Sequence, residues 1–243
     1  MKEYKNIIFD LFDTLILFNP ELLPVIELDN KIYHSTGMDV FNTFSYYFPK
    51  IYFNEFYNFF TLSYRKFQEL KNIDNREYVN SKRFEIMLDQ MNLNYNNKIL
   101  DDLVVSHMSS LEKSMIFPEK HRIVLDYLKE KSYNLSILSN FDYSPTANKL
   151  LDIYNITHYF DYIFISDQIG WRKPSPKIFE YAIEKIGENK SDILFIGNDF
   201  ERDIIGAQNS GIDSIYINLN NKYSDINAFV ESVNSLNEII TFI

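Results

Sequence analysis

The chain has 243 residues, of which 46% are hydrophobic and 16% aromatic, with a formal net charge of −10 and no cysteine. This length and composition suit one large domain or two modest ones and exclude a disordered chain. The negative charge, without any basic run, argues against binding to the phosphate backbone of a nucleic acid. The lack of cysteine excludes disulfides and cysteine-based metal sites.

The first apolar stretch is interrupted by Asp10 too early for a signal peptide, and no apolar run is long enough to span a bilayer. We therefore expect a soluble, cytoplasmic protein that has neither a membrane nor a nucleic acid as its partner. The sequence does not decide between a monomer and a homodimer.

The first predicted element is a short buried strand over residues 7–9, which ends at Asp10. In open α/β sheets, functional sites gather beyond the carboxyl ends of the strands. Asp10 would stand at such an end. An aspartate after a short apolar run is also a common turn former, so this stretch alone does not make Asp10 catalytic.

Asn19-Pro20 is a turn signal, and the segment from about residue 20 to 116 then shows helical spacing. Bulky apolar side chains recur at intervals of three and four, as one buried helix face requires. They are Phe53, Phe56, Tyr57, Phe60 and Tyr64, followed by Phe84, Met87, Leu88 and Met91. The pattern predicts an inserted helical subdomain. Its cations, Arg65, Lys66, Arg76, Lys82 and Arg83, are interpreted as solvated helix faces, one of which could reach over a site.

From Phe117 onward the pattern changes to strands alternating with helices, which is typical of a parallel sheet with crossovers. Strands are predicted over residues 133–138, 162–165, 192–196 and 214–218. Helices are predicted over residues 176–186 and 202–210, each followed by a glycine that can end it. The fold class is therefore α/β.

Polar residues follow nearly every one of these strands. If Asp10 attacks an electrophile that carries negative oxygens, the site must neutralise the developing charge. Ser139 can donate a hydroxyl hydrogen bond, and Lys173 can supply a positive charge. Asp199 and Asp203, with Asn198 beside them, offer the oxygen ligands that Mg²⁺ prefers.

Together these pieces resemble the haloacid dehalogenase superfamily of hydrolases. The resemblance is carried by Asp10-Leu11-Phe12-Asp13-Thr14, Ser139-Asn140, Lys173-Pro174-Ser175-Pro176, and Gly197-Asn198-Asp199-Phe200-Glu201-Arg202-Asp203 with Gly206-Ala207. It implies a Rossmann-like core, a parallel sheet with helices on both faces, over residues 1–18 and 114–243. It also implies an all-α cap over residues 19–113 that selects the substrate.

The resemblance further implies a Mg²⁺-dependent phosphatase of a small phosphorylated metabolite. Asp10 would be the nucleophile that forms an aspartyl-phosphate, with Thr14 and Lys173 assisting. Ser139, Asn140 and Lys173 would bind the substrate. Mg²⁺ would be held by Asp10, the backbone carbonyl of Phe12, Asn198, Asp199 and Asp203.

Two positions depart from the family pattern. Phe12 stands where related phosphatases carry a second aspartate that protonates the leaving group, so we expect a preference for acyl or aryl phosphates. Asn198 stands where the family has its first metal-binding aspartate, so metal affinity should fall unless Asp199 substitutes.

Phe12 also leaves two alternatives open. The family's dehalogenases have an aromatic residue at that position and a Ser-Asn pair like Ser139-Asn140, but need no metal. A ligand-binding pseudoenzyme with little turnover is the other alternative. His34, His107, His121 and His158 lack metal-ligand spacing, and no role is assigned to them.

Overall fold

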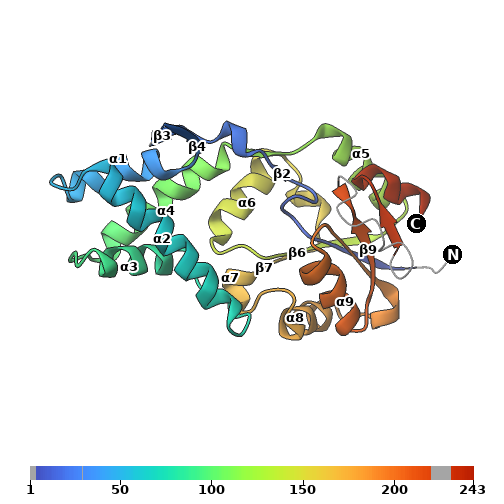
Figure 1. Ribbon diagram of the computed structural model, residues 1–243. Helices are drawn as coiled ribbons and strands as arrows, with labels where there is room; N and C mark the ends of the chain where they lie inside the picture. The colour runs from blue at the N-terminus through green and yellow to red at the C-terminus, as the bar shows by residue number, and fades with distance from the viewer. Residues whose placement is uncertain (1–3, 29, 220–230) are drawn as a thin grey trace. The chain divides into compact units, whose positions relative to one another are not determined.

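The computed structural model describes residues 4–28, 30–219 and 231–243 (Figure 1). The chain forms two compact units. The core unit is Met1–Leu17 with Phe117–Ile243, and the cap unit is Phe18–Ile116. The sequence placed the two boundaries after residues 18 and 113.

The core unit is built on a parallel six-stranded sheet with the strand order β10-β9-β8-β1-β6-β7. The strands are β1 (Asn6–Phe9), β6 (Asn134–Ser139), β7 (Tyr162–Ile165), β8 (Ile193–Gly197), β9 (Asp213–Ile217) and β10 (Glu231–Val233). Phe9 pairs with Ile137 on one side and Ile196 on the other. This register places Asp10 between the ends of β6 and β8.

Helices pack around this sheet and bury it, which explains why its strands are continuous apolar runs. Ile7, Ile8 and Phe9 are all fully buried. Ile178 and Phe179 of one helix join Ile8 and Phe195 in a common core cluster. The helices of this unit are α5 (Glu119–Glu130), α6 (Ser144–Ile153), α7 (Ser166–Ile169), α8 (Pro176–Ile186) and α9 (Gly206–Asn209), with 3-10 helices at Thr157–Tyr159, Lys190–Asp192 and Leu236–Thr241.

Most core elements lie where the sequence predicted them, but the helix expected over residues 202–210 differs. A π-helical segment, Phe200–Ile205, comes first, and α9 continues from Gly206. The Asp199 side chain accepts a hydrogen bond from the amide of Arg202, and the Asp199 carbonyl accepts one from Asp203. These bonds start the segment earlier than the apolar pattern suggested.

The cap unit consists of the helices α1 (Gly37–Tyr47), α2 (Phe53–Asn72), α3 (Ser81–Gln90) and α4 (Asn97–Glu112), with a 3-10 helix at Pro20–Leu22. Its core contains the rings of Phe44, Phe56 and Phe60, with centroids 4.8 and 5.5 Å apart along this series. The aromatic spacing on α2 therefore marked a buried face. Tyr64 is an exception, because it is 51% exposed.

A β-hairpin interrupts the cap unit, which is therefore not purely α-helical as expected. Its strands are β3 (Val25–Leu28) and β4 (Lys31–His34), which pair antiparallel. Asn30 has a φ of +60°, a conformation that asparagine tolerates better than most residues. A second short sheet pairs β2 (Leu17–Phe18) with β5 (Met115–Ile116).

Arg83 corrects another expectation. The sequence placed it on a solvated helix face, but it is only 4% exposed. Its guanidinium lies 4.1 Å from the centroid of the Phe60 ring and donates a hydrogen bond to the Phe60 carbonyl. Charge on a helical residue did not reveal this, because the aromatic ring and backbone carbonyl that accept the guanidinium come from another helix.

Within the described residues, none of the helices has both the length and the apolar composition needed to cross a membrane.

Candidate active site

The candidate site lies in the core unit, at the carboxyl ends of β1, β6 and β8. Asp10 follows β1 directly and is 7% exposed, and its amide donates to the carbonyl of Ile196 on β8. A cavity of about 190 Å³ opens beside it. The lining residues are Asp10, Phe12, Asp13, Asn140, Lys173, Asn198, Asp199, Arg202 and Asp203.

Lys173 links two carboxylates in this site. Its Nζ lies 2.7 Å from Asp10 Oδ1 and 2.6 Å from Asp203 Oδ1, and all three side chains are buried. Burial alone would lower the pKa of Lys173, but the two carboxylates outweigh it and the pKa is raised. Lys173 is therefore a permanent cation beside Asp10.

Asn140 holds the backbone that carries this lysine. Its Nδ2 donates to the carbonyl of Lys173 at 2.9 Å, and its Oδ1 accepts from the amide of Lys173 at 2.7 Å. This paired bond ties the end of β6 to the loop after α7. The structure thus gives Asn140 a positioning role, while a direct contact with substrate stays a prediction.

Both carboxylate oxygens of Asp203 already have a partner within the protein. Oδ1 pairs with Lys173, and Oδ2 accepts from the amide of Asp199 at 2.9 Å. Burial raises the pKa of the Asp203 carboxyl to about 6, with Lys173 opposing the rise and Asp10 adding to it. The side chain thus serves mainly to hold Lys173 in place.

Thr14 joins the nucleophile to the last motif. Its Oγ1 lies 3.2 Å from Asp10 Oδ2 and 3.1 Å from Asn198 Oδ1. A hydroxyl has one proton, so Thr14 can donate to only one of these oxygens at a time. Thr14 is 2% exposed and so holds both side chains from the interior.

Ser139, at the end of β6, is 1% exposed, and its Oγ has no hydrogen-bond partner among the described residues. Buried hydroxyls are normally paired, so an unpaired one at a strand end needs an explanation. A bound substrate oxygen would provide the missing acceptor.

Phe12 carries no ionisable group, and its ring packs against Phe141 with centroids 4.5 Å apart. Both residues follow the ends of neighbouring strands, β1 and β6. Asp13, the next residue, has a φ of +61°, and its amide donates to the carbonyl of Ile16. Asp13 thus stands in a tight turn and also lines the cavity.

The oxygen donors that line the site include four carboxylates, those of Asp10, Asp13, Asp199 and Asp203. In the part of the chain that the structure describes, no group of three or more histidine, aspartate or glutamate side chains is placed to hold a metal ion. Asp203 is occupied by Lys173 and the Asp199 amide, and Asp199 by the amide of Arg202. Asp10 Oδ1 pairs with Lys173, whereas Asp10 Oδ2 and Asn198 Oδ1 share the single proton of the Thr14 hydroxyl. Together with the carbonyl of Phe12, these two oxygens form a set that fits Mg²⁺ only if the ion keeps several waters.

Arg202 is a site residue that the sequence did not single out. It lines the cavity, and its Nη1 lies 3.5 Å from Asp199 Oδ2. Its position three residues after Asp199, in the last motif, was the available signal. Of the residues that the sequence singled out, the cavity lining contains Asp10, Phe12, Asn140, Lys173, Asn198, Asp199 and Asp203, and it does not include Thr14 or Ser139. The chemical roles of all of them stay predictions.

The model of the family described as haloacid dehalogenase-like hydrolase matches residues 36–217. This chain belongs to that family. A glyceraldehyde 3-phosphate phosphatase of Pyrococcus abyssi is 27% identical to this haloacid dehalogenase-like hydrolase over 216 residues, which are 87% of this chain and 80% of the relative. A protein of the same name from Methanothermobacter thermautotrophicus is 36% identical over 102 residues, 42% of this chain and less than half, 44%, of the relative.

The solved structures are similar in fold. The crystal structure of a 2-haloacid dehalogenase from Pseudomonas syringae has a TM-score of 0.70 at 19% identity, and the match covers 98% of this chain and 97% of that one. At this identity the likeness establishes the fold alone. The chain is thus a haloacid dehalogenase-like hydrolase with a Rossmann-like core.

Proposed function

We propose that the protein is a phosphatase that hydrolyses a small phosphorylated metabolite through a covalent intermediate on Asp10. The observation that carries this proposal is the buried Asp10–Lys173–Asp203 chain of charges, together with the unpaired Ser139 hydroxyl at the end of the neighbouring strand β6. A carboxylate nucleophile, a fixed cation and a spare donor are what transfer of an anionic phosphoryl group requires. The names of the relatives support a phosphorylated substrate.

In the first step, an oxygen of Asp10 attacks phosphorus, the bond from phosphorus to the leaving oxygen breaks, and an aspartyl-phosphate forms. Lys173 and Ser139 stabilise the phosphoryl oxygens while Thr14 fixes the carboxylate in line with the bond that breaks. In the second step, water attacks the aspartyl-phosphate, which releases inorganic phosphate and restores Asp10.

Magnesium would be bound by Asp10, the carbonyl of Phe12 and Asn198, with Asp199 as a further ligand if its side chain leaves the amide of Arg202. When bound, the ion supplies positive charge to the phosphoryl oxygens. The asparagine at 198 leaves this ligand set with fewer negative charges than an aspartate would, so we expect weak binding of the metal.

The absence of a proton donor at position 12 determines which substrates suit the site. An alkoxide is a poor leaving group without protonation, whereas acyl phosphates and aryl phosphates release better leaving groups. We therefore expect acetyl phosphate and an aryl phosphate to react faster than glyceraldehyde 3-phosphate. Equal rates on all three would mean that another group supplies the proton.

The test is phosphate release from these substrates with Mg²⁺ and with EDTA. The native protein, Asp10→Asn and Glu180→Gln are compared. Glu180 lies on the exposed face of α8, so its variant controls for the loss of one negative charge. Metal-dependent turnover that disappears only in Asp10→Asn is expected. No turnover by the native protein would refute the proposal.

One observation favours a second candidate, hydrolysis of a 2-haloacid. Phe12 and Phe141 form an aromatic pair at the edge of the site, and displacement of halide requires no proton for the leaving group. Asp10 would attack the carbon that bears the halogen, halide would leave, and water would hydrolyse the resulting ester. Halide release from 2-chloropropionate in EDTA, lost in Asp10→Asn, would replace the phosphatase proposal.

A further inference from the structure

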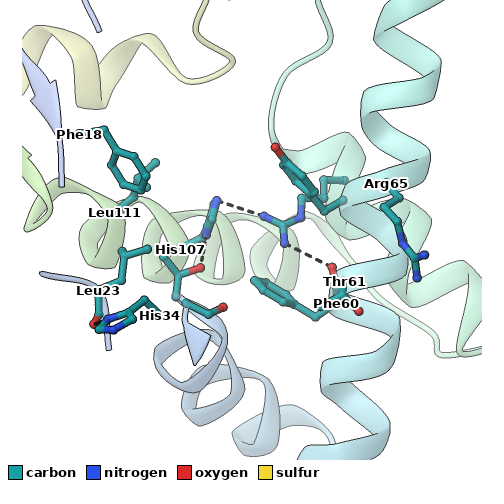
Figure 2. A pocket seen from close by; sticks show the side chains of 12 residues that line it. Phe18, Leu23, His34, Phe60, Thr61, Arg65, His107 and Leu111 are labelled. Atoms are coloured by element: carbon teal, nitrogen blue, oxygen red, sulfur yellow. Dashed lines mark hydrogen bonds between the residues drawn. The ribbon is translucent and has the colours of Figure 1, made fainter. Parts of the chain in front are cut away.

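The cap unit contains a cavity of its own, with a volume of about 490 Å³. This lies within the range of small-molecule binding pockets. Its lining residues all belong to the cap unit and are Phe18, Leu23, His34, Ser35, Thr36, Phe60, Thr61, Tyr64, Arg65, Arg83, His107 and Leu111. Figure 2 shows Phe18, Leu23 and His34 on one side and Phe60, Thr61 and Arg65, all from α2, on the other.

The charged side chains of this lining are all positively charged. Two arginines and two histidines line the cavity, and neither an aspartate nor a glutamate is among the lining residues. The chain as a whole has a net charge of −10. A cation-lined, acid-free cavity in an acidic protein is complementary to an anion.

Arg83 is fixed at the wall of the cavity by several contacts. Nη1 donates to His107 Nε2 at 3.1 Å, and Nη2 donates to the Phe60 carbonyl at 3.3 Å. The guanidinium also lies over the rings of Phe60 and Tyr64, at 4.1 and 5.3 Å from their centroids. Its charge is thus held in place at the apolar wall, where an anion would meet it with little reorganisation.

The bond from Arg83 also determines the proton of His107. A guanidinium only donates, so Nε2 of His107 accepts and the ring proton is on Nδ1. Burial, with the nearby Arg83 charge, holds the pKa of His107 well below its usual range, so the ring is neutral. Nδ1 then donates to Thr36 Oγ1 at 2.7 Å. The Thr36 hydroxyl, whose oxygen accepts this bond, keeps its own proton to donate elsewhere.

Apart from Ser35 and Thr61, the rest of the lining is apolar or aromatic. Phe18, Leu23, Phe60 and Leu111 surround the polar groups, and Tyr64 exposes half of its surface. Such walls suit a flat hydrocarbon or aromatic body, since rings pack well against rings. The cavity thus combines a place for a ring with donors for an acid group.

We propose that this cap cavity binds a small organic anion, in which an aromatic or similarly flat apolar body carries a carboxylate or a phosphate. The anionic group is met by Arg83 and Arg65, and the body lies against Phe18, Phe60 and Leu111. This binding does not depend on the chemistry of Asp10. The ligand is either the organic part of the substrate or a separate effector, and the two share the same recognition chemistry.

The test uses the full-length Asp10→Asn protein, in which hydrolysis cannot interfere, and 2-naphthoate as the probe. Isothermal titration should show binding of 2-naphthoate. The neutral 2-naphthol, with the same rings, and acetate, with the charge alone, should bind at least about tenfold more weakly because each lacks one half of the interaction. Equal affinity for naphthoate and naphthol, or no binding of naphthoate, would overturn the proposal.

Two added substitutions, Arg65→Gln and Leu111→Trp, locate the site, and Lys66→Gln is their control. Arg65→Gln removes an exposed cation of the lining and should weaken 2-naphthoate about fivefold. Lys66→Gln, at the next position of α2 and outside the lining, should leave the affinity unchanged. Leu111→Trp should fill the cavity and abolish binding, with its helix content checked by circular dichroism. Naphthoate binding that is equal in all of these variants would place the probe elsewhere and refute the cap site.

Inhibition kinetics show whether the ligand is the organic part of the substrate or a separate effector. The hydrolysis of an aryl phosphate by the native enzyme is measured with and without 2-naphthoate. Naphthoate that raises KM without changing kcat, with the effect reduced in Arg65→Gln, identifies the cavity as the site for the organic part of the substrate. A change in kcat, or no inhibition, identifies an effector site. Because binding is measured on Asp10→Asn, a failure of the phosphatase proposal leaves this result intact.

Discussion

At the scale of single residues, Phe12 leads to the most specific prediction about catalysis. Its ring lies against Phe141, and it places no acid beside the leaving group. Replacing Phe12 with aspartate should raise the rate on glyceraldehyde 3-phosphate on the order of 10²-fold, because general acid catalysis becomes possible. The rate on acetyl phosphate should change much less. The measurement is kcat/KM on both substrates.

The matched control is Phe12→Leu, which removes the ring but adds no acid. Losing the contact with Phe141 should cost about 1 kcal/mol of stability in either variant. A similar gain in Phe12→Leu would show that the ring merely obstructs the site, and the idea of a missing proton donor would be abandoned.

Asn198 determines how tightly the site should hold Mg²⁺. Asn198→Asp adds a negative charge to the ligand set and keeps an oxygen for Thr14 to donate to. The concentration of Mg²⁺ that gives half-maximal phosphate release should fall about tenfold. Asn189→Asp, an exposed position before β8, is the control for added charge. If both variants respond alike, Asn198 is not a metal ligand.

The sequence could place Asp10, Ser139 and Asn198 together, because each directly follows a strand and parallel strands end at one edge. The sequence could not show which side chains and carbonyls surround Arg83 and His107. Both are helical residues whose neighbours come from other helices, and an arginine at a polar helix position looks solvated until the rings and carbonyls around it are known.

At the scale of elements, Gly197 at the end of β8 allows the last motif to pack. A Cβ on Gly197 would lie 2.6 Å from Cγ of Asp203, which cannot move without releasing Lys173. Gly197→Ala should therefore displace the chain of charges and lower kcat on the order of 10²-fold, as misplacement of a catalytic group does. The measurement is acetyl phosphate hydrolysis.

Gly206, at the start of α9, provides the comparison. A Cβ there would meet the Phe179 ring at 2.6 Å, which is a packing contact with α8. Both glycine variants should lose about 1–3 kcal/mol of stability from overpacking, but Gly206→Ala should retain its kcat. Equal losses of kcat would mean that Gly197 acts only through stability.

Apolar periodicity identified most elements, including α8 between Pro176 and Gly187, because its helical face and its stop signals agree. The hairpin of β3 and β4 was missed although Asp29-Asn30 between β-branched and aromatic residues is a turn signal. The π-helical segment has no such signal, because hydrogen bonds of Asp199 and Asp203 create it.

At the scale of the whole molecule, each unit contains a histidine whose pKa is held below its usual value. His107 lies in the cap unit and accepts from Arg83. His121 lies in the core unit and donates from Nδ1 to the Leu15 carbonyl at 2.9 Å. Burial is the main cause that lowers the pKa of each. Both units therefore lose stability from the same chemistry when the solution is acidified.

The direction of the change in stability with pH follows from the number of protons that the folded and the unfolded chain bind. The folded chain keeps both imidazoles neutral below their usual pKa of 6.5, so the unfolded chain binds more protons there. Their contribution is complete above pH 6.5 and is lost as the pH falls toward the lowered pKa values. Between pH 6.5 and 5 each histidine that stays neutral should cost up to about 2 kcal/mol of unfolding free energy. Urea unfolding at a series of pH values measures this.

Single substitutions show how much of the pH dependence of stability comes from each unit. His107→Gln and His121→Gln keep a donor and an acceptor but cannot be protonated, so each should flatten the fall in stability of its own unit. His158→Gln replaces an exposed imidazole and should leave the pH profile unchanged. If His107→Gln and His121→Gln leave the pH profile as it is in the native protein, or if His158→Gln alters it as much as they do, the neutral state of these two histidines is refuted. A profile flattened by His107→Gln alone would show that the cap unit unfolds first on acidification.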